Sequence, residues 1–202
     1  MAPLVAVLDY GIGNLRSATK ALEKAGADAR LTADPAVVAD AAGVVLPGVG
    51  AFGRCMEALR DTGLEPVAKD AAASGRPFLG ICIGMQMLFE SSDESPGVAG
   101  LGILPGAIRL LPDGVKRPQM QWNTLQVRRP HPLLAGLGDE PWMYFVHSYA
   151  PEDGPHVVAT CDYGGAIPVL VERDNVVAAQ FHPEKSGANG LGLLRNWVDA
   201  LS

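Results

Sequence analysis

The sequence Pro77-Phe78-Leu79-Gly80-Ile81-Cys82-Ile83-Gly84-Met85-Gln86 passes from a strand pattern into a helical pattern. It predicts a buried strand over residues 77–81 and a helix over residues 84–90. Gly80 and Gly84 flank Cys82 with the spacing of a nucleophile elbow, in which cysteine takes the place of serine. The backbone must pass very close at such a turn, so both flanking positions need to lack a side chain.

Strand and helix patterns alternate before this stretch. Continuous apolar runs predict strands covered on both faces at residues 4–8 and 43–46, and a short strand is expected at residues 29–32. Apolar residues at helical spacing predict helices over 15–25, 52–60 and 64–73, with Gly26 ending the first and Asp34-Pro35 beginning another. Right-handed crossovers between such units give a mostly parallel sheet. The first half therefore predicts an α/β fold with helices on both faces of the sheet.

The second half of the chain has a different character. Short strand-like segments between proline- and glycine-rich turns predict an antiparallel extension of the same sheet or a flap attached to it, at residues 120–127, 143–146, 157–162 and 169–172. A further strand is expected at residues 176–181, and a closing helix carries a stripe of leucine and valine. No repeat or linker divides the chain, so residues 1–202 are expected to form a single domain.

Composition excludes several classes of protein. The 202 residues are 48% hydrophobic and 19% charged, which is typical of a folded chain and not of a disordered one. The net charge is -6 and no cluster of basic residues exists, which argues against nucleic-acid binding. No apolar run approaches the roughly 20 residues that span a bilayer. The N-terminus lacks the basic region of a signal peptide.

The cysteine and histidine content indicates where the protein is located and whether it binds a metal ion. The chain has four histidines and three cysteines, Cys55, Cys82 and Cys161. An odd number of cysteines in a chain of ordinary size argues against a disulfide framework and for a reducing, cytoplasmic location. No paired spacing of cysteine and histidine is present, so we expect neither a metal nor a cofactor.

Cys82 is the candidate nucleophile. A helix that begins just after it would favour the thiolate, since free amides and the helix dipole stabilise negative charge. The alternative is that Cys82 is a small buried residue, as free cysteines often are. This stretch alone leaves both interpretations open.

Phe181-His182-Pro183-Glu184 follows the last predicted strand and supplies a candidate base with a carboxylate. Residues two apart in an extended segment project to the same side, so Glu184 can bind one imidazole nitrogen and leave the other for a thiol proton. Parallel strands end at one edge of a sheet, which would bring His182 next to Cys82. Alternatively, the segment turns the chain out of the sheet with both side chains in water.

Acyl transfer also needs two donors aimed at the developing oxyanion. The amide of Ile83, directly after the nucleophile, is one candidate. Pro47-Gly48-Val49-Gly50 ends another strand at the same edge and could supply the second donor from Val49 or Gly50. An ordinary strand-to-helix turn explains this segment equally well.

These features together resemble class I glutamine amidotransferases, through residues 80–86 and 181–186. Within that family the sequence is similar to the glutaminase subunits of imidazole glycerol phosphate synthase, an enzyme of histidine biosynthesis. The similarity spans nearly the whole chain and rests on Asp9-Tyr10-Gly11-Ile12-Gly13-Asn14-Leu15-Arg16-Ser17, Pro47-Gly48-Val49-Gly50, Met120-Gln121-Trp122-Asn123 and Tyr144-Phe145-Val146-His147-Ser148-Tyr149. Such subunits usually have glycine before the Trp-Asn pair, so Gln121 leaves the contact geometry there in question.

The resemblance implies a reaction and a partner. Glutamine would be hydrolysed to glutamate and ammonia through a thioester on Cys82, with His182 as acid and base and Glu184 orienting it. The ammonia would pass to a (β/α)8-barrel cyclase subunit in a heterodimer. That subunit would form imidazole glycerol phosphate and the aminoimidazole carboxamide ribonucleotide.

The resemblance also implies roles for residues around the triad. Those lining the glutamine pocket would be Gln86, Glu94, Ser148 and Tyr149. The segment of residues 47–50 would reorient when the partner is occupied, so that the amide of Val49 completes the oxyanion hole. Those facing the partner would be Asn14, Trp122, Asn123 and Lys185.

Three other interpretations stay open. The chain could be the glutaminase subunit of another class I amidotransferase, such as pyridoxal phosphate synthase or anthranilate synthase, since the same triad would serve. It could be a catalytically inactive regulatory module on the same fold, although Cys82, His182 and Glu184 argue against this. The third is a self-sufficient cysteine hydrolase, but no separate substrate domain or lid is evident in the sequence.

Overall fold

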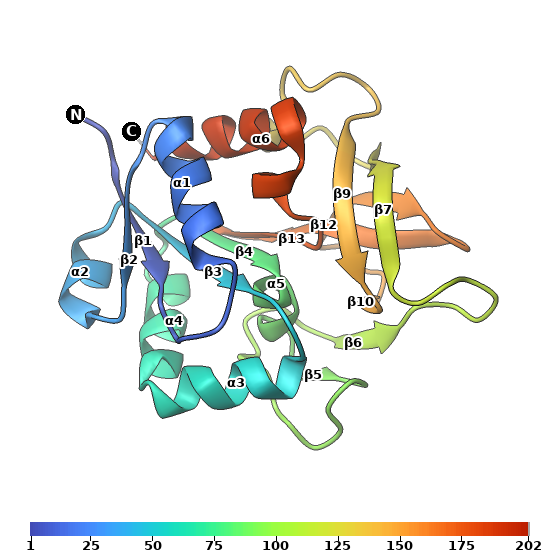
Figure 1. The fold of residues 1–202 in the computed structure, drawn as a ribbon, viewed down its shortest axis with the longest axis horizontal. Helices are drawn as coiled ribbons and strands as arrows, with labels where there is room; N and C mark the ends of the chain where they lie inside the picture. Colours follow the sequence, from blue (N-terminus) through green and yellow to red (C-terminus); the bar gives the residue numbers. More distant parts are fainter. Residues whose placement is uncertain (202) are drawn as a thin grey trace.

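The computed structural model describes residues 1–201 and has an eight-stranded sheet at its centre (Figure 1). In spatial order the strands are β2 (Asp28–Thr32), β1 (Leu4–Leu8), β3 (Gly43–Gly48), β4 (Phe78–Cys82), β13 (Val176–Ala179), β12 (Ala166–Arg173), β11 (Val157–Asp162) and β8 (Gln126–Val127). The strands from β2 to β13 run parallel. Strands β12, β11 and β8 continue the sheet in antiparallel pairs. This confirms the predicted α/β class with an antiparallel extension.

Helices cover both faces of this sheet. Helices α1 (Leu15–Ala25) and α6 (Gly187–Asp199) pack against each other on one face, and α3 (Phe52–Asp61) and α4 (Leu64–Ala73) do so on the other (Figure 1). The central strands β3, β4 and β13 are fully buried and largely apolar, as expected for strands covered on both sides. Within residues 1–201, no helix has the length and apolar character needed to cross a membrane.

The predicted C-terminal end of the first helix and the predicted start of the second helix are confirmed by their caps. Gly26, after α1, has a φ of 110°, a left-handed conformation that favours glycine. Helix α2 (Pro35–Asp40) begins after Asp34, whose carboxylate accepts a hydrogen bond from the amide of Ala36 at 2.9 Å. Both boundaries thus follow from local side-chain chemistry.

The predicted antiparallel extension or flap is divided between sheets: β12, β11 and β8 extend the main sheet, and its other strands do not join that sheet. Strands β7 (Gln119–Thr124) and β9 (Trp142–His147) form a separate antiparallel pair. A third sheet joins three short strands that the sequence pattern does not predict, namely β5 (Ser91–Ser92), β6 (Ala107–Leu110) and β10 (Tyr149–Pro151). The strand predicted over residues 120–127 is interrupted at Leu125, whose side chain is buried and whose amide donates to the carbonyl of Pro141.

Two boundaries at the centre of the sheet also differ from the prediction. The helix expected over residues 84–90 is the shorter α5 (Ile83–Met87), because the amides of residues 101–104 bind the carbonyls of residues 87–89. Strand β3 continues past residue 46, because Pro47 and Gly48 pair with Ile81 and Cys82 of β4. The second difference brings the end of β3 to the same edge as the end of β4.

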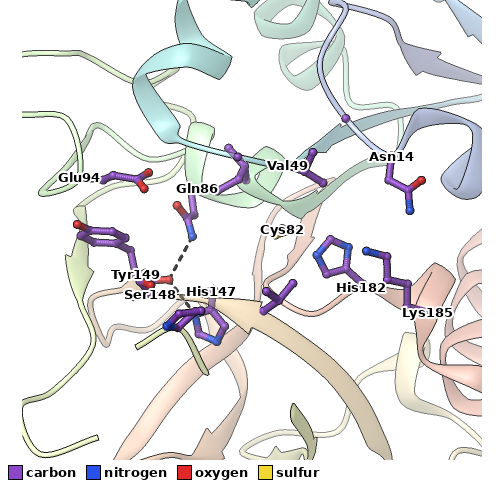
Figure 2. Close-up of a pocket in the computed structure, with 15 residues that line it drawn as sticks. Asn14, Val49, Cys82, Gln86, Glu94, His147, Ser148, Tyr149, His182 and Lys185 are labelled. Atoms are coloured by element: carbon purple, nitrogen blue, oxygen red, sulfur yellow. Dashed lines mark hydrogen bonds between the residues drawn. The ribbon is translucent and has the colours of Figure 1, made fainter. Parts of the chain in front are cut away.

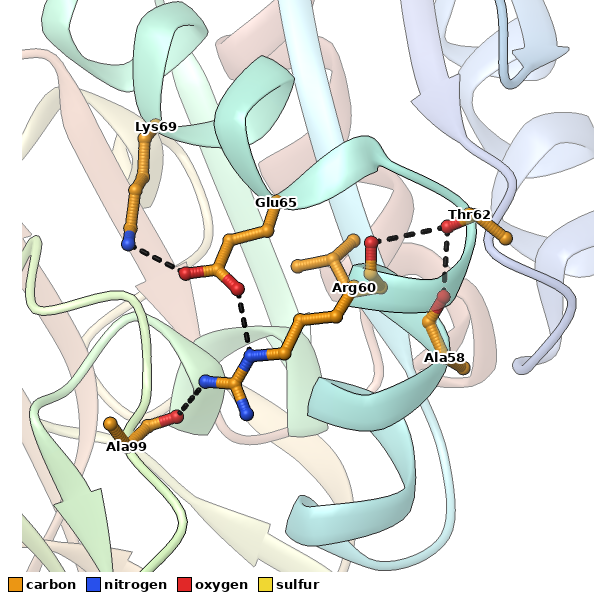
Figure 3. Close-up of polar contacts among 7 residues, drawn as sticks. Ala58, Arg60, Thr62, Glu65, Lys69 and Ala99 are labelled. Carbon is orange, nitrogen blue, oxygen red and sulfur yellow. Dashed lines mark hydrogen bonds and ion pairs between the residues drawn. The ribbon is translucent and has the colours of Figure 1, made fainter.

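Polar contacts fasten the loop after β5 to helices α3 and α4 (Figure 3). Arg60 donates to the carbonyl of Ala99 at 2.7 Å and to Glu65 at 2.8 Å. Lys69 donates to the other oxygen of Glu65 at 2.6 Å, and these two cations lower the pKa of Glu65. The contacts hold the loop that carries Glu94 beside α3.

Candidate active site

Cys82 lies at the turn between β4 and α5 in a strained backbone conformation. Its φ is 55° and its ψ is -113°. Within residues 1–201, Asp174 is the only other non-glycine residue with a positive φ. Gly84 makes the turn possible, because a Cβ there would lie 1.8 Å from the carbonyl oxygen of Leu46. The predicted elbow is therefore present and places Cys82 at the carboxyl edge of the sheet.

His182 reaches the same edge from the end of β13. This strand runs parallel to β4, with Ala179 opposite Ile81, so the residues that follow both strands meet. Cys82 and His182 accordingly line one cavity (Figure 2). Nδ1 of His182 lies 2.8 Å from Oε1 of Glu184. Both side chains are buried, with 2% and 3% of their surface exposed, so they do not lie in water.

The surroundings of His182 favour its charged form. Burial alone would lower its pKa, but contacts with Cys82 and Glu184 raise the pKa of His182 to about 9. At neutral pH the imidazole is therefore protonated. Glu184 occupies Nδ1, which leaves Nε2 for the sulfur. A cation beside a cysteine favours the thiolate, which is the nucleophilic form.

The loop that carries His182 is tied to strand β9. The amide of His182 donates to the carbonyl of Tyr144 at 3.0 Å. The hydroxyl of Ser186 donates to the carbonyl of His182 at 2.6 Å and accepts from the amide of Tyr144 at 2.9 Å. Ser186 is buried, and the sequence analysis did not single it out. These bonds fix the imidazole from the side of the β7–β9 pair.

A cavity of about 590 Å³ opens above the thiol (Figure 2). This volume lies in the range of small-molecule sites. Glu184 binds the back of the His182 ring and does not line the cavity. Trp122 and Asn123 do not line the cavity either. The structure brings most of the predicted site residues together in the lining, namely Asn14, Val49, Gly50, Cys82, Ile83, Gln86, Glu94, Ser148, Tyr149, His182 and Lys185.

Two buried glutamines connect the thiol to the wall of the cavity. Nε2 of Gln180 lies 3.9 Å from the sulfur of Cys82, within reach of a weak N–H···S hydrogen bond. Gln86 donates from its own Nε2 to Oε1 of Gln180 at 3.0 Å and to the carbonyl of Tyr149 at 3.1 Å. Gln180 is not among the predicted site residues, although a polar residue at the end of an apolar strand could have marked it. Oε1 of Gln86 is buried and has no hydrogen-bond partner within residues 1–201.

His147 is a second buried histidine of the cavity that the sequence analysis missed. Its Nδ1 donates to the carbonyl of Tyr149 at 2.9 Å, while Nε2 is buried without a partner. Burial chiefly, and the nearby charge of His182, lower the pKa of His147 to about 4. The imidazole is neutral at pH 7, so Nε2 is a buried acceptor in the wall of the cavity.

Glu94 approaches the cavity from the loop after β5. Its Oε2 accepts a hydrogen bond at 2.7 Å from the amide of Phe52, the first residue of α3. The carboxylate is held in place by this bond and lines the cavity opposite the histidines (Figure 2). A fixed carboxylate at this position can bind an ammonium group.

The predicted oxyanion donors lie next to the sulfur. Strand β3 ends at Gly48, which is opposite Cys82 in the register with β4. Val49 and Gly50 follow and line the cavity. Ile83, the first residue of α5, lies at the other side of the thiol. The arrangement can therefore place two amides around a carbonyl oxygen bound at Cys82.

The predicted partner-facing residues fall into two groups. Asn14 and Lys185 lie at the rim beside His182 (Figure 2). Trp122 is 47% exposed on β7 and its ring lies edge-to-face with Tyr144, with 5.9 Å between the ring centres. Asn123 uses its amide within the chain instead, donating to the carbonyl of Asp162 at 2.9 Å.

The family model described as glutamine amidotransferase class-I matches residues 6–200 of this chain. This chain belongs to the class I glutamine amidotransferase family. A relative in this family, imidazole glycerol phosphate synthase subunit HisH of Salinibacter ruber, is 49% identical over 96% of this chain and 94% of that protein. The protein of the same name from Methanothermobacter thermautotrophicus is 48% identical over 98% of this chain and 99% of that protein.

Solved structures agree in fold with this class I glutamine amidotransferase. A crystal structure of a glutamine amidotransferase has a TM-score of 0.77 at 23% identity and covers 98% of both chains. The structure of PurLQS from Thermotoga maritima has a TM-score of 0.76 at 22% identity over 100% of both chains. These likenesses confirm the predicted fold class.

Gln121, which stands where such amidotransferase subunits usually carry glycine, does not disturb the backbone. It pairs with Phe145 in the regular register of β7 and β9. Its side chain is exposed and its φ is not positive. Strand β7 therefore accepts a side chain at this position without strain.

Proposed function

We propose that this class I glutamine amidotransferase is the glutaminase subunit of an imidazole glycerol phosphate synthase, which serves histidine biosynthesis. The subunit hydrolyses L-glutamine to glutamate and ammonia. The observation that carries the proposal is the 49% identity over 96% of the chain with a subunit of that name. The buried contact of His182 with Glu184 beside the Cys82 cavity supports an active enzyme and not an inactive module.

The reaction begins with Cys82 as thiolate and His182 as imidazolium. The sulfur attacks the carboxamide carbon of glutamine, which forms the C–S bond and moves the carbonyl π electrons onto oxygen. The amides of Ile83 and Val49 donate to this oxyanion. The tetrahedral intermediate then collapses: the C–N bond breaks, His182 gives its proton to the leaving nitrogen, and ammonia departs from a thioester.

Water completes the cycle. Neutral His182 removes a proton from a water molecule while the water oxygen attacks the thioester carbon. The second tetrahedral intermediate collapses by breaking the C–S bond, which releases the product with a protonated γ-carboxyl group and restores thiolate and imidazolium. The γ-carboxyl group then loses its proton to water, giving glutamate. Glu184 holds Nδ1 of His182 through both halves, so Nε2 carries the exchanged proton.

The polar groups of the cavity suit an amino-acid substrate. Glu94 is the carboxylate for the α-ammonium group of glutamine. Oε1 of Gln86 is a buried acceptor without a partner, as is Nε2 of His147. Ser148 and Tyr149 complete the wall opposite α3.

The ammonia passes to a partner subunit, which we take to be a (β/α)8-barrel cyclase. The relatives are named as subunits of a synthase, which implies a second chain. Ammonia released into water at neutral pH becomes mostly ammonium, which is not nucleophilic, so a dry path between the two sites is required. Asn14 and Lys185 at the rim, with Trp122 and Asn123 on β7, are the residues we assign to the partner face. The free, buried state of all three cysteines suits the reducing cytoplasm.

Cys82→Ala tests the mechanism. Glutamate release, measured with the barrel subunit and its nucleotide ligand present, should fall by on the order of a thousandfold or more, since the covalent route is lost. The ammonia-dependent synthase reaction of the same complex should persist, because it does not use the thiol. Cys161→Ala is the matched control, since Cys161 is equally buried and lies outside the cavity. Glutaminase activity retained by Cys82→Ala would disprove the mechanism.

The identity of the partner is tested separately from the triad. Glutaminase activity of the unaltered chain should rise sharply when the barrel subunit and its ligand are added. The synthase subunits of anthranilate synthase or pyridoxal phosphate synthase should give no such rise. A rate that is indifferent to the barrel subunit would contradict the proposed function while leaving the chemistry of Cys82 intact.

A further inference from the structure

The segment of residues 47–50 is held from inside the molecule by two buried side chains. The hydroxyl of Tyr10 donates to the carbonyl of Pro47 at 2.6 Å. The thiol of Cys55, on α3, donates to the carbonyl of Val49 at 3.3 Å. Tyr10 is 1% exposed and Cys55 is fully buried, and neither belongs to the triad or to the cavity lining.

Both side chains keep the proton that these bonds need. Burial raises the pKa of Cys55 to about 11 and raises the pKa of Tyr10 well above its ordinary value. The two groups also contact each other, so they form one buried pair beneath the segment. At neutral pH each is a donor to a backbone carbonyl.

The two anchored carbonyls lie on either side of a single peptide group. The carbonyl of Pro47 belongs to the peptide before Gly48, and the carbonyl of Val49 belongs to the peptide before Gly50. Between them is the Gly48–Val49 peptide, which carries the Val49 N–H. Gly48 has no room for a side chain, because a Cβ would lie 2.8 Å from the Tyr10 hydroxyl, and Gly50 has a φ of 98°.

We infer that Tyr10 and Cys55 are positioning residues of the glutaminase reaction, which hold the peptides flanking the Val49 N–H. The inference rests on the proposed function, in which that N–H is an oxyanion donor. With both neighbours held, rotation is confined to the Gly48–Val49 peptide. A loosened anchor lets the whole segment adopt more orientations, so fewer molecules aim the donor at the intermediate.

The test compares Tyr10→Phe, Cys55→Ala and Cys55→Ser in the complete complex with saturating nucleotide ligand. We expect kcat for glutamine hydrolysis to fall roughly three- to tenfold in Tyr10→Phe and Cys55→Ala, less than the hundred- to thousandfold caused by losing an oxyanion donor outright. KM should stay within about twofold, because an oxyanion donor acts in the transition state. Cys55→Ser keeps a donor and should restore most of kcat, and Cys161→Ala should match the unaltered enzyme.

Alkylation of Cys82 by iodoacetamide separates positioning from damage to the fold. That reaction needs the thiolate but no oxyanion hole, so its rate should not change in any variant. An unchanged kcat in both Tyr10→Phe and Cys55→Ala would overturn the inference, as would a Cys55→Ser variant as slow as Cys55→Ala. The unaltered complex serves as the reference for the proposed function itself: if it fails to hydrolyse glutamine, the proposed function is wrong, whatever the variants do.

Discussion

Two histidines in the active site are held in opposite charge states by what surrounds them. His182 has a carboxylate and a sulfur as neighbours, which together raise its pKa to about 9 against the effect of burial. His147 donates from Nδ1 to a backbone carbonyl and its Nε2 has no hydrogen-bond partner, and burial lowers its pKa to about 4. One ring is thus a proton donor at neutral pH, and the other is a fixed acceptor.

These shifts predict the pH dependence of stability. His182 titrates at about 9 when folded and at 6.5 when unfolded, so its stabilisation is complete below pH 6.5 and is lost as the pH rises through 9. His147 behaves inversely, and its contribution is lost as the pH falls from 6.5 through 4. Denaturant unfolding of the unaltered chain, His182→Asn and His147→Asn between pH 4 and 10 measures their free energies of unfolding. The free-energy difference between the unaltered chain and His182→Asn should shrink as the pH rises from 6.5 through 9. The difference from His147→Asn should shrink as the pH falls from 6.5 through 4. Parallel curves for the three proteins would contradict the assignment.

The hydrogen bond from Gln180 to the sulfur should matter for turnover. Gln180→Leu removes the N–H donor that lies 3.9 Å from the sulfur of Cys82, and an ordinary hydrogen bond contributes about 0.5–1.5 kcal/mol. We therefore expect kcat to fall by roughly two- to tenfold with a small change in KM. Steady-state glutaminase kinetics in the complex measure both constants.

The chain contains a matched control for this prediction. Gln119 is also fully buried and its Nε2 lies 3.7 Å from the sulfur of Cys161, outside the cavity lining. Gln119→Leu creates the same kind of buried change and should leave kcat near that of the unaltered enzyme. Equal losses of kcat in the Gln119 and Gln180 variants would mean that the effect is on the fold and not on the nucleophile.

At the scale of elements, the sequence predicts what local chemistry determines. The first three strands, the helix caps and the elbow at Cys82 follow from apolar runs, Gly26, Asp34 and the two glycines of the elbow. The end of α5 does not, because it depends on amides of residues 101–104 that are distant in the sequence. The separation of β7 from the main sheet likewise depends on pairing with β9.

The candidate site shows the same division. Cys82, His182 and Glu184 could be predicted because they follow strand ends, and most other predicted residues of the cavity lie in the motifs on which the family resemblance rests. Glu94 lies in none of these motifs and is implied by the resemblance alone. Ser186 could not be predicted, because it acts through the amide of Tyr144, which is distant in the chain. The contact of Cys55 with Val49 is closer in the chain, but no sequence pattern marks it. Gln180 could have been marked as a polar residue at the end of an apolar strand, although its contact with Cys82 could not.

The elbow requires a residue without a side chain at position 84, and this requirement can be tested. A Cβ at Gly84 would lie 1.8 Å from the backbone oxygen of Leu46, which cannot move without shifting β3. Gly84→Ala should lower the free energy of unfolding by about 3 kcal/mol or more, as severe overpacking does. In Gly192→Ala, on α6, the nearest atom is the end of the flexible Leu137 side chain, so the change should stay within about 1 kcal/mol. Equal denaturation midpoints for the two variants would contradict this account of the turn.

At the scale of the whole molecule, strands from both ends of the chain build the catalytic edge. Strand β1 begins at Leu4 and β13 ends at Ala179, and both lie in the eight-stranded sheet. We infer from this interleaving that the described residues, 1–201, form one domain. The β7–β9 pair stands apart from the main sheet but is bonded to the His182 loop through Tyr144, so it connects the protein surface to the triad.

Two exposed tryptophans on this pair test where the partner binds. Trp122 is 47% exposed and packs against Tyr144, whereas Trp142 is 55% exposed and pairs with Thr124 at the end of the ladder. Large aromatic side chains dominate interface energies, and only Trp122 is assigned to the partner face. Trp122→Ala should therefore raise the Kd of the complex by roughly tenfold or more.

Trp142→Ala removes an equally large and exposed ring from the same strand pair, so it controls for general loss of apolar surface. Its Kd should stay within about twofold of the unaltered value, measured by titrating the barrel subunit and following stimulated glutaminase activity. Because Trp122 packs against Tyr144, whose backbone holds the His182 loop, its loss should also lower the maximal stimulation at saturating partner. If Trp142→Ala weakens binding as much as Trp122→Ala, the assignment of the partner face to Trp122 and not to Trp142 is wrong.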